Sequence, residues 1–235
     1  MDIKGDFGPE GTVFVSDIHR GSSFSMSSLF SKFLARIPSG MRVVLVGDTY
    51  DFWKRCPSDE EISLLRDRDI IYLIGNHDRE ILAGSVFSTR ISRSLNMELS
   101  GKKFLVTHGD VFDTKFGANE LPHRIIDCMI YRMSEILGYD FRTRWGFVTK
   151  YYYSRATNYI GITNRKLMNA GYQGLVSRHT HCPEFECRDG FWNINLGCWY
   201  RDPKALFVSK DGRYKYVSIE EDFPLPSEED FDSLR

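Results

Sequence analysis

The chain has 235 residues, of which 42% are hydrophobic and 27% charged, a balance that excludes disordered and fibrous proteins. Its net charge of -1 excludes a basic field over the whole molecule, so any surface for nucleic acid must be local. The apolar runs are shorter than the roughly 20 residues that cross a bilayer, and the first residues do not form a signal peptide. Five cysteines without a CxxC spacing suit a reducing compartment. We therefore expect a cytoplasmic protein without a transmembrane segment; peripheral membrane contact and oligomeric state stay open.

The first half of the chain predicts alternating strands and helices. Residues 12–16 and 42–46 are short β-branched and apolar runs that stop at polar residues, as buried parallel strands do. Between them, residues 25–37 carry apolar side chains at helical spacing and end before Pro38-Ser39-Gly40. This order is a strand, helix, strand unit. A polar helix over 59–67 and strands over 70–74 and 103–107 follow.

The second half predicts an inserted segment and then more strands. Residues 114–170 read as a helical insertion, or cap, because they are rich in Arg, Tyr and Phe and have few strand or turn signals. Strands resume at 173–177, 190–195, 204–208 and 214–219. Residues 220–235 contain seven acids, two prolines and one arginine, which predicts a solvated and flexible tail. We therefore expect one α/β domain over residues 1–219.

Polar residues gather where the predicted strands end, and five of the six histidines are among them. They are Asp17 and His19, Asp48 and Asp51, the run Asn76, His77 and Asp78, then His108, and finally His179 and His181. Ligands of open α/β sheets bind beyond the carboxyl ends of the strands. We therefore expect these five clusters to converge on one cleft.

The clusters contain the ligand types of a metal site. Carboxylates, imidazoles and an amide oxygen, without cysteine, suit Mn, Fe or Zn more than Ca alone. They are too many for one tetrahedral site, so two metals are expected. Taken alone, each short motif is more often a turn, a cap or a surface feature, with a prior of roughly one in ten for a metal role. His123 lies outside the pattern and is interpreted as an ordinary helix histidine.

Five motifs resemble the signatures of the calcineurin-like metallophosphoesterases. They are Ser16-Asp17-Ile18-His19, Gly47-Asp48-Thr49-Tyr50-Asp51, Gly75-Asn76-His77-Asp78, Thr107-His108-Gly109-Asp110 and His179-Thr180-His181. The resemblance implies a four-layer α/β/β/α sandwich around a two-metal site. It implies that one metal is held by Asp17, His19, Asp48 and His181, and the other by Asp48, Asn76, His108 and His179. Asp48 would bridge the two metals, for which Mn²⁺ is expected and Fe or Zn are alternatives.

Finer features are similar to the UDP-2,3-diacylglucosamine hydrolase branch of this family. They are Asp51-Phe52-Trp53, the Arg-rich insertion, and the run Trp192 to Trp199. The chain departs from the branch at His77, where its lipid A pathway members often carry Arg, and from the family at Arg178, which replaces the usual Gly before His-Thr-His. Arg178 either strains a turn that glycine makes easily or reaches a substrate phosphate. We assign it to substrate binding.

The remaining residues suggest catalytic roles and a substrate class. His77 is the candidate for stabilising the transition state or protonating the leaving oxygen, with Asp78 orienting its ring and Asp51 steadying His77 or a metal ligand. The insertion carries nine basic residues against four acidic ones, which suits a substrate with several phosphates.

We expect hydrolysis of a phosphodiester or pyrophosphate bond in a nucleotide-linked or lipid-linked small molecule, such as UDP-2,3-diacylglucosamine. One alternative is a broad phosphodiesterase or nuclease, although nucleic acid is not the favoured partner. The alternative of another class is a non-catalytic scaffold that binds proteins.

Overall fold

The protein is described by a computed structural model that covers most of the chain outside the insertion. The described residues are 3–4, 7–22, 25–51, 58–75, 78, 90–112, 129, 132–133, 136–137, 161–178, 184–199 and 202–234. Within the predicted insertion, the described residues 129, 132–133, 136–137 and 161–169 are all helical. The rest of that prediction lies outside the described residues.

The first sheet has the strand order β11-β12-β2-β3-β4-β5, and β13 pairs with β12. Its strands are β2 (Thr12–Val15), β3 (Arg42–Val46), β4 (Ile70–Leu73), β5 (Arg90–Ser92), β11 (Gly197–Cys198), β12 (Asp202–Val208) and β13 (Tyr214–Ser218). The run from β2 to β5 is parallel, as the sequence predicted for its first two strands. β12 joins β2 antiparallel and extends the sheet on its other side.

The second sheet has the strand order β1-β6-β7-β8-β10-β9. Its strands are β1 (Ile3–Lys4), β6 (Ser94–Leu99), β7 (Lys102–Thr107), β8 (Gly174–Ser177), β9 (Glu184–Arg188) and β10 (Phe191–Asn195). β7, β8 and β10 are parallel neighbours, although the whole insertion separates β7 from β8 along the chain. The carboxyl ends of β7 and β8 therefore lie side by side.

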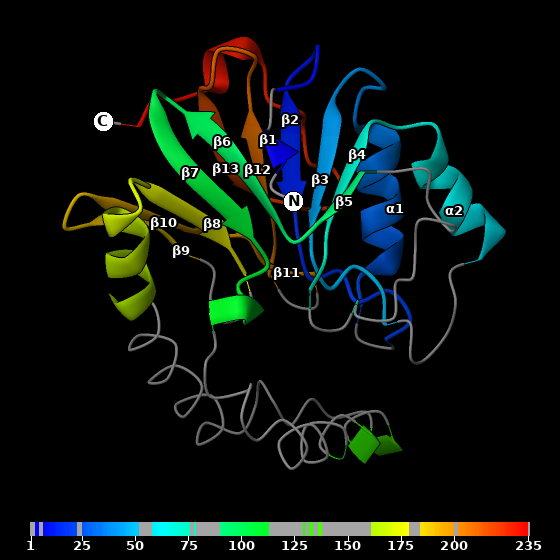
Figure 1. Ribbon diagram of the computed structural model, residues 1–235. Coiled ribbons are helices and arrows are strands. Elements are labelled where there is room, and N and C mark those ends of the chain that lie inside the picture. Colours follow the sequence, from blue (N-terminus) through cyan, green and yellow to red (C-terminus); the bar gives the residue numbers. More distant parts are fainter. Residues whose placement is uncertain are drawn as a thin grey trace.

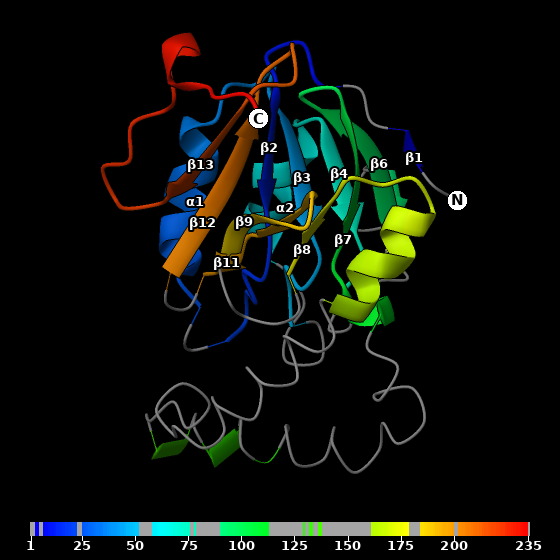
Figure 2. The same cartoon turned by 90° about the vertical axis from the view of Figure 1, so that its left-hand side faces the viewer.

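The two sheets form the middle of a four-layer sandwich (Figures 1 and 2). Helices α1 (Ser27–Arg36) and α2 (Asp59–Arg66) cover the outer face of the first sheet, and the helix at 161–169 covers the second. Between the sheets lies an apolar core that includes Phe14, Val44, Phe104 and Val106. The predicted α/β/β/α sandwich is confirmed.

Helix α1 shows how the sequence builds one outer layer. Phe30, Phe33 and Leu34 are spaced along one face of the helix and are buried against the first sheet. The ring centroids of Phe30 and Phe33 lie 5.2 and 5.3 Å from that of Trp199, which follows β11. The helix ends at Arg36, one residue before the extended Ile37 that leads into Pro38. This packing fixes α1 on the first sheet, and with it the end of the β2–α1 loop.

The chain after β13 differs from the predicted flexible tail. Leu234 is buried in the core between the sheets, and Phe223 and Phe231 pack against the core under α1. Asp232 exchanges backbone hydrogen bonds with Tyr214, and the short 3-10 helix η2 (Glu228–Asp230) lies between these contacts. The seven acids dominate the composition of this segment, but its few apolar residues decide where it lies.

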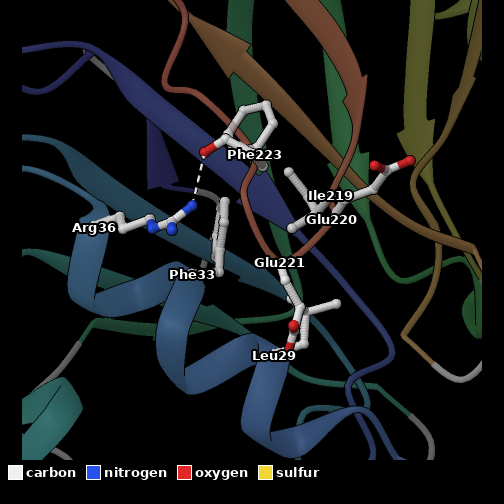
Figure 3. A pocket seen from close by; sticks show the side chains of 7 residues that line it. All are labelled: Leu29, Phe33, Arg36, Ile219, Glu220, Glu221 and Phe223. Carbon is white, nitrogen blue, oxygen red and sulfur yellow. Dashed lines mark hydrogen bonds between the residues drawn. The ribbon is translucent and has the colours of Figure 1, made fainter.

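The end of the chain also packs on α1. Lys32 pairs with Glu221 at 2.7 Å. Arg36 donates a hydrogen bond to the Phe223 carbonyl at 3.0 Å, which Figure 3 draws as a dashed line. The small crevice between them is lined by Leu29, Phe33, Arg36, Ile219, Glu220, Glu221 and Phe223. None of these is a predicted site residue. Within the described part of the chain, no helix has the length and apolar character needed to cross a membrane.

Candidate metal centre

The predicted ligands that the structure describes meet where strands of both sheets end. Asp17 and His19 follow β2, Asp48 follows β3, and His108 follows β7. Ligand atoms of Asp17, Asp48 and His108 all lie within 4.8 Å of one another. All four side chains are buried. The predicted convergence therefore holds for these four residues.

Backbone pairing beyond the strands places these side chains. The amide of Asp17 donates to the Gly47 carbonyl at 3.2 Å, and that of His19 donates to the Asp48 carbonyl at 3.0 Å. Asp17, His19 and Asp48 have φ angles of 50°, 48° and 50°. This left-handed backbone costs a residue with a Cβ roughly 1–2 kcal/mol. These three residues with a strained backbone lie together after β2 and β3. The strain lowers the stability of the folded protein, and it places the three side chains in the cluster.

Asp48 is the centre of the cluster. Its Oδ2 lies 3.3 Å from His108 Nε2 and 3.9 Å from His19 Nε2, while Asp17 Oδ1 lies 3.6 Å from His108 Nδ1. Gly47 has a φ of +79°, and a Cβ at this position would lie 2.6 Å from His108 Nδ1. The loop after β3 can therefore approach the second sheet only because residue 47 lacks a side chain.

Each histidine is oriented by a partner on its other ring nitrogen. His19 Nδ1 lies 2.8 Å from Asp51 Oδ1, and His108 Nδ1 lies 3.2 Å from the Val46 carbonyl oxygen. Both rings therefore turn their Nε2 atoms toward Asp48. Asp51 was predicted to steady either His77 or a metal ligand. The structure describes its contact with the predicted ligand His19, whereas His77 lies outside the described residues. Carboxylate or carbonyl partners of this kind commonly hold metal-binding imidazoles in place.

The carboxylates also change the protonation of the two rings. Burial by itself lowers the pKa of His19, but the carboxylates of Asp51, Asp17 and Asp48 outweigh it and raise the pKa to about 10. Burial likewise lowers the pKa of His108, and Asp48, Asp17 and Asp110 raise it to about 10. Without a metal, protons therefore balance the carboxylates. A bound cation would displace these protons.

Asp78 holds the loop that carries Asp48. Its Oδ2 accepts hydrogen bonds from the backbone amides of Asp48 at 2.5 Å and Gly75 at 2.9 Å, and its Oδ1 accepts from the Tyr72 hydroxyl at 2.7 Å. Burial and the Asp48 carboxylate raise the pKa of Asp78 to about 6. The sequence reading missed Tyr72. Its signal was a tyrosine in the middle of a buried strand, where the hydroxyl needs a partner.

Arg178 lies inside the cluster. It follows β8 and is fully buried, and its Nε lies 2.8 Å from Asp17 Oδ2. Within the described residues it is not among the non-glycine residues with positive φ, so the predicted turn strain is absent. Its guanidinium faces Asp17, and its contact with a substrate phosphate stays a prediction. Asn76, His77, His179 and His181 lie outside the described residues.

The described donors fit a divalent cation. Asp17, Asp48 and His108 offer hard oxygen and imidazole nitrogen ligands within one buried cluster, and His19 Nε2 lies 3.9 Å from both aspartates. Each imidazole already has a partner on Nδ1 and directs Nε2 inward. The cluster therefore has the donor chemistry and the second layer of support that a metal site needs.

Comparison with known proteins leads to the same family. Residues 12–134 match the profile of the calcineurin-like phosphoesterase superfamily domain. The chain is 25% identical over 230 residues to UDP-2,3-diacylglucosamine hydrolase of Neisseria meningitidis, covering 85% of this chain and 94% of that protein.

Two further comparisons cover most of the chain. The Haemophilus influenzae protein of the same name is 23% identical over 237 residues, covering 88% of this chain and 98% of that one. The solved structure of an archaeal phosphodiesterase is 17% identical, covers 88% of this chain and 98% of that chain, and has a TM-score of 0.44. With the profile match and the site geometry, the chain belongs to the calcineurin-like phosphoesterase superfamily and is a metal-dependent phosphoesterase.

Proposed function

We propose that this protein uses two divalent cations to hydrolyse a pyrophosphate or phosphodiester bond in a nucleotide-linked substrate such as UDP-2,3-diacylglucosamine. The observation that carries the proposal is the meeting of Asp17 and Asp48 from the first sheet with His108 from the second. Such a cluster can bind a cation, and the central position of Asp48 suits a ligand that two cations share. The curated relatives, which are named for this hydrolase, support the substrate class.

The proposed ligand sets divide around Asp48. One cation would be held by Asp17, His19, Asp48 and His181, and the other by Asp48, Asn76, His108 and His179. We propose Mn²⁺ for both positions, with Fe and Zn as alternatives that the same donors accept. When bound, the cations would supply Lewis-acid chemistry, because they lower the pKa of a shared water and neutralise phosphate oxygens.

The remaining residues would prepare the site and complete the reaction. Asp51 holds the His19 ring, and Asp78 fixes the backbone of Asp48. We assign His77 to the proton that the leaving oxygen takes up, because it follows β4 in the same run as Asn76. The contact of Asp78 with His77 is a further part of the proposal. The basic insertion would bind phosphates of the substrate outside the reacting bond.

Substitution of His77 by alanine separates metal binding from turnover. We expect His77→Ala to keep the metal content of the unchanged protein and to lower kcat about 100-fold, because positioned acids contribute at least this much. Mass spectrometry of the metals and steady-state kinetics measure the two effects. His123→Ala removes a histidine outside the motifs and should change neither. Loss of metal from His77→Ala would contradict the assignment.

The function is tested by metal content together with a substrate panel. The purified full chain is loaded with Mn²⁺ and assayed on UDP-2,3-diacylglucosamine, a dinucleoside polyphosphate, a generic phosphodiester and short DNA. About two metals per chain and a clear preference for the UDP-lipid are the expected result. A preference for DNA would instead favour a nuclease. Two bound metals without turnover on any of these would favour a binding scaffold.

A further inference from the structure

Arg178 and Asp17 form a buried ion pair inside the proposed metal site. Both side chains are fully buried, and Arg178 Nε lies 2.8 Å from Asp17 Oδ2. The other carboxylate oxygen of Asp17 accepts a hydrogen bond from Ser16 Oγ at 2.9 Å. The Arg178 amide donates to the His108 carbonyl and the Arg178 carbonyl accepts from Asn195, so both hydrogen bonds fix the backbone of Arg178 beside the cluster.

The two aspartates differ in one of the cations that they face. Both carboxylates lie near the imidazoles of His19 and His108, at 3.3 to 3.9 Å. Asp17 also faces a guanidinium, which keeps its charge at every pH that a folded protein meets. A fixed positive charge therefore stays beside Asp17 when a metal binds.

We propose that Arg178 is a resident cation that shares the Asp17 carboxylate with the metal on that side and makes this metal bind more weakly. The inference rests on the proposed two-metal function. A fixed positive charge next to the Asp17 ligand set repels a second cation in a buried site of low dielectric. The ligand set of Asp48 and His108 would fill first, and the set of Asp17 and His19 second. Arg178 would also balance Asp17 while that position is empty.

Titration calorimetry with Mn²⁺ on the metal-stripped full chain tests the inference. The unchanged protein should show two binding phases whose Kd values differ at least 10-fold. Arg178→Met removes the charge at similar length and should tighten the weaker phase at least 10-fold, whereas Arg178→Lys keeps the charge and the separation. Two phases that Arg178→Met leaves unchanged, or two equal phases in the unchanged protein, would overturn the inference but not the proposed function. A protein that binds no Mn²⁺ would overturn the proposed function itself.

Thermal melting keeps the test valid if Arg178→Met is unstable. Without metal, Arg178→Met should melt below the unchanged protein, because Asp17 loses its buried counter-charge. Mn²⁺ should then raise its Tm by more than it raises the Tm of the unchanged protein. The control is Arg42→Met, which breaks the 2.7 Å pair between the buried Arg42 and the partly exposed Asp69 at the opposite end of β3. Equal Tm increments from Mn²⁺ in the two variants would count against the inference.

Discussion

Replacing Asp48 by alanine should remove metal binding and activity together. A carboxylate oxygen of Asp48 lies within 4.8 Å of ligand atoms of Asp17 from the first sheet and His108 from the second. Loss of this carboxylate therefore deprives both proposed cations of an anionic ligand. We expect kcat/KM to fall by at least about 1,000-fold, which corresponds to roughly 4 kcal/mol of lost transition-state stabilisation. Metal content by mass spectrometry and phosphate release, measured on one preparation, report the two losses.

A second variant at this position separates charge from backbone strain. Asp48 has a φ of 50°, which alanine tolerates poorly and asparagine well. Asp48→Asn should therefore keep the fold and still lose metal and activity. Asp211→Asn removes a carboxylate in the β12–β13 turn, where Asp211 pairs with Arg213, and should leave both unchanged. Two bound metals in Asp48→Asn would refute the shared-ligand role.

Adding one methyl group at Gly75 should disable the same carboxylate without removing it. A Cβ on Gly75 would fall against Asp48 Oδ1 and lie 2.7 Å from the Asp48 backbone nitrogen. Asp48 must then move, and the hydrogen bonds of Asp78 to both residues are disturbed. We expect a loss in kcat/KM on the order of 1,000-fold, since a displacement near 1 Å costs about 100-fold and metal affinity falls as well.

Gly161→Ala is the matched control for Gly75→Ala. Neither glycine has a φ in the left-handed region, so alanine fits the backbone at both positions. A Cβ on Gly161 meets no atom of the described residues within 4 Å, and the residue lies in the helical stretch 161–169. This variant should keep full activity and metal content. If Gly75→Ala keeps the metal affinity of the unchanged protein, close packing against Asp48 is not what the site requires.

The parallel strands of the first sheet could be predicted from sequence because they are buried on both faces. Runs such as Val43 to Val46 are continuous and apolar, and their ends are marked by polar residues. β9 was missed because its residues are half exposed and mostly polar. β6 was missed although Leu95, Met97 and Leu99 alternate toward the core. Half-buried strands give a weaker signal, even where the partner strand follows directly along the chain, as β7 follows β6 and β10 follows β9.

The candidate site was predicted as far as strand order determines it. Parallel strands align their carboxyl ends, which is why Asp17, Asp48 and His108 could be expected to meet. The pair between Arg178 and Asp17 could not be predicted, because it depends on the direction of a long side chain between two sheets. The sequence likewise gave no sign that Asp78 would bind the backbone of Asp48. Contacts between the two sheets depend on how side chains pack against each other. The spacing of residues along the sequence does not reveal this packing.

The cluster lies across the boundary between the two sheets, and this position links catalysis to the thickness of the core. Asp48 follows a strand of one sheet and His108 follows a strand of the other. The distance between their backbones therefore depends on the spacing of the two sheets, which is about 10 Å in such sandwiches. Phe14 and Phe104 help to set that spacing. Bound cations would tie the sheets together as a cross-link. A change of volume deep in the core would therefore act on the chemistry before it unfolds the protein, and mutational tolerance there should follow activity more than stability.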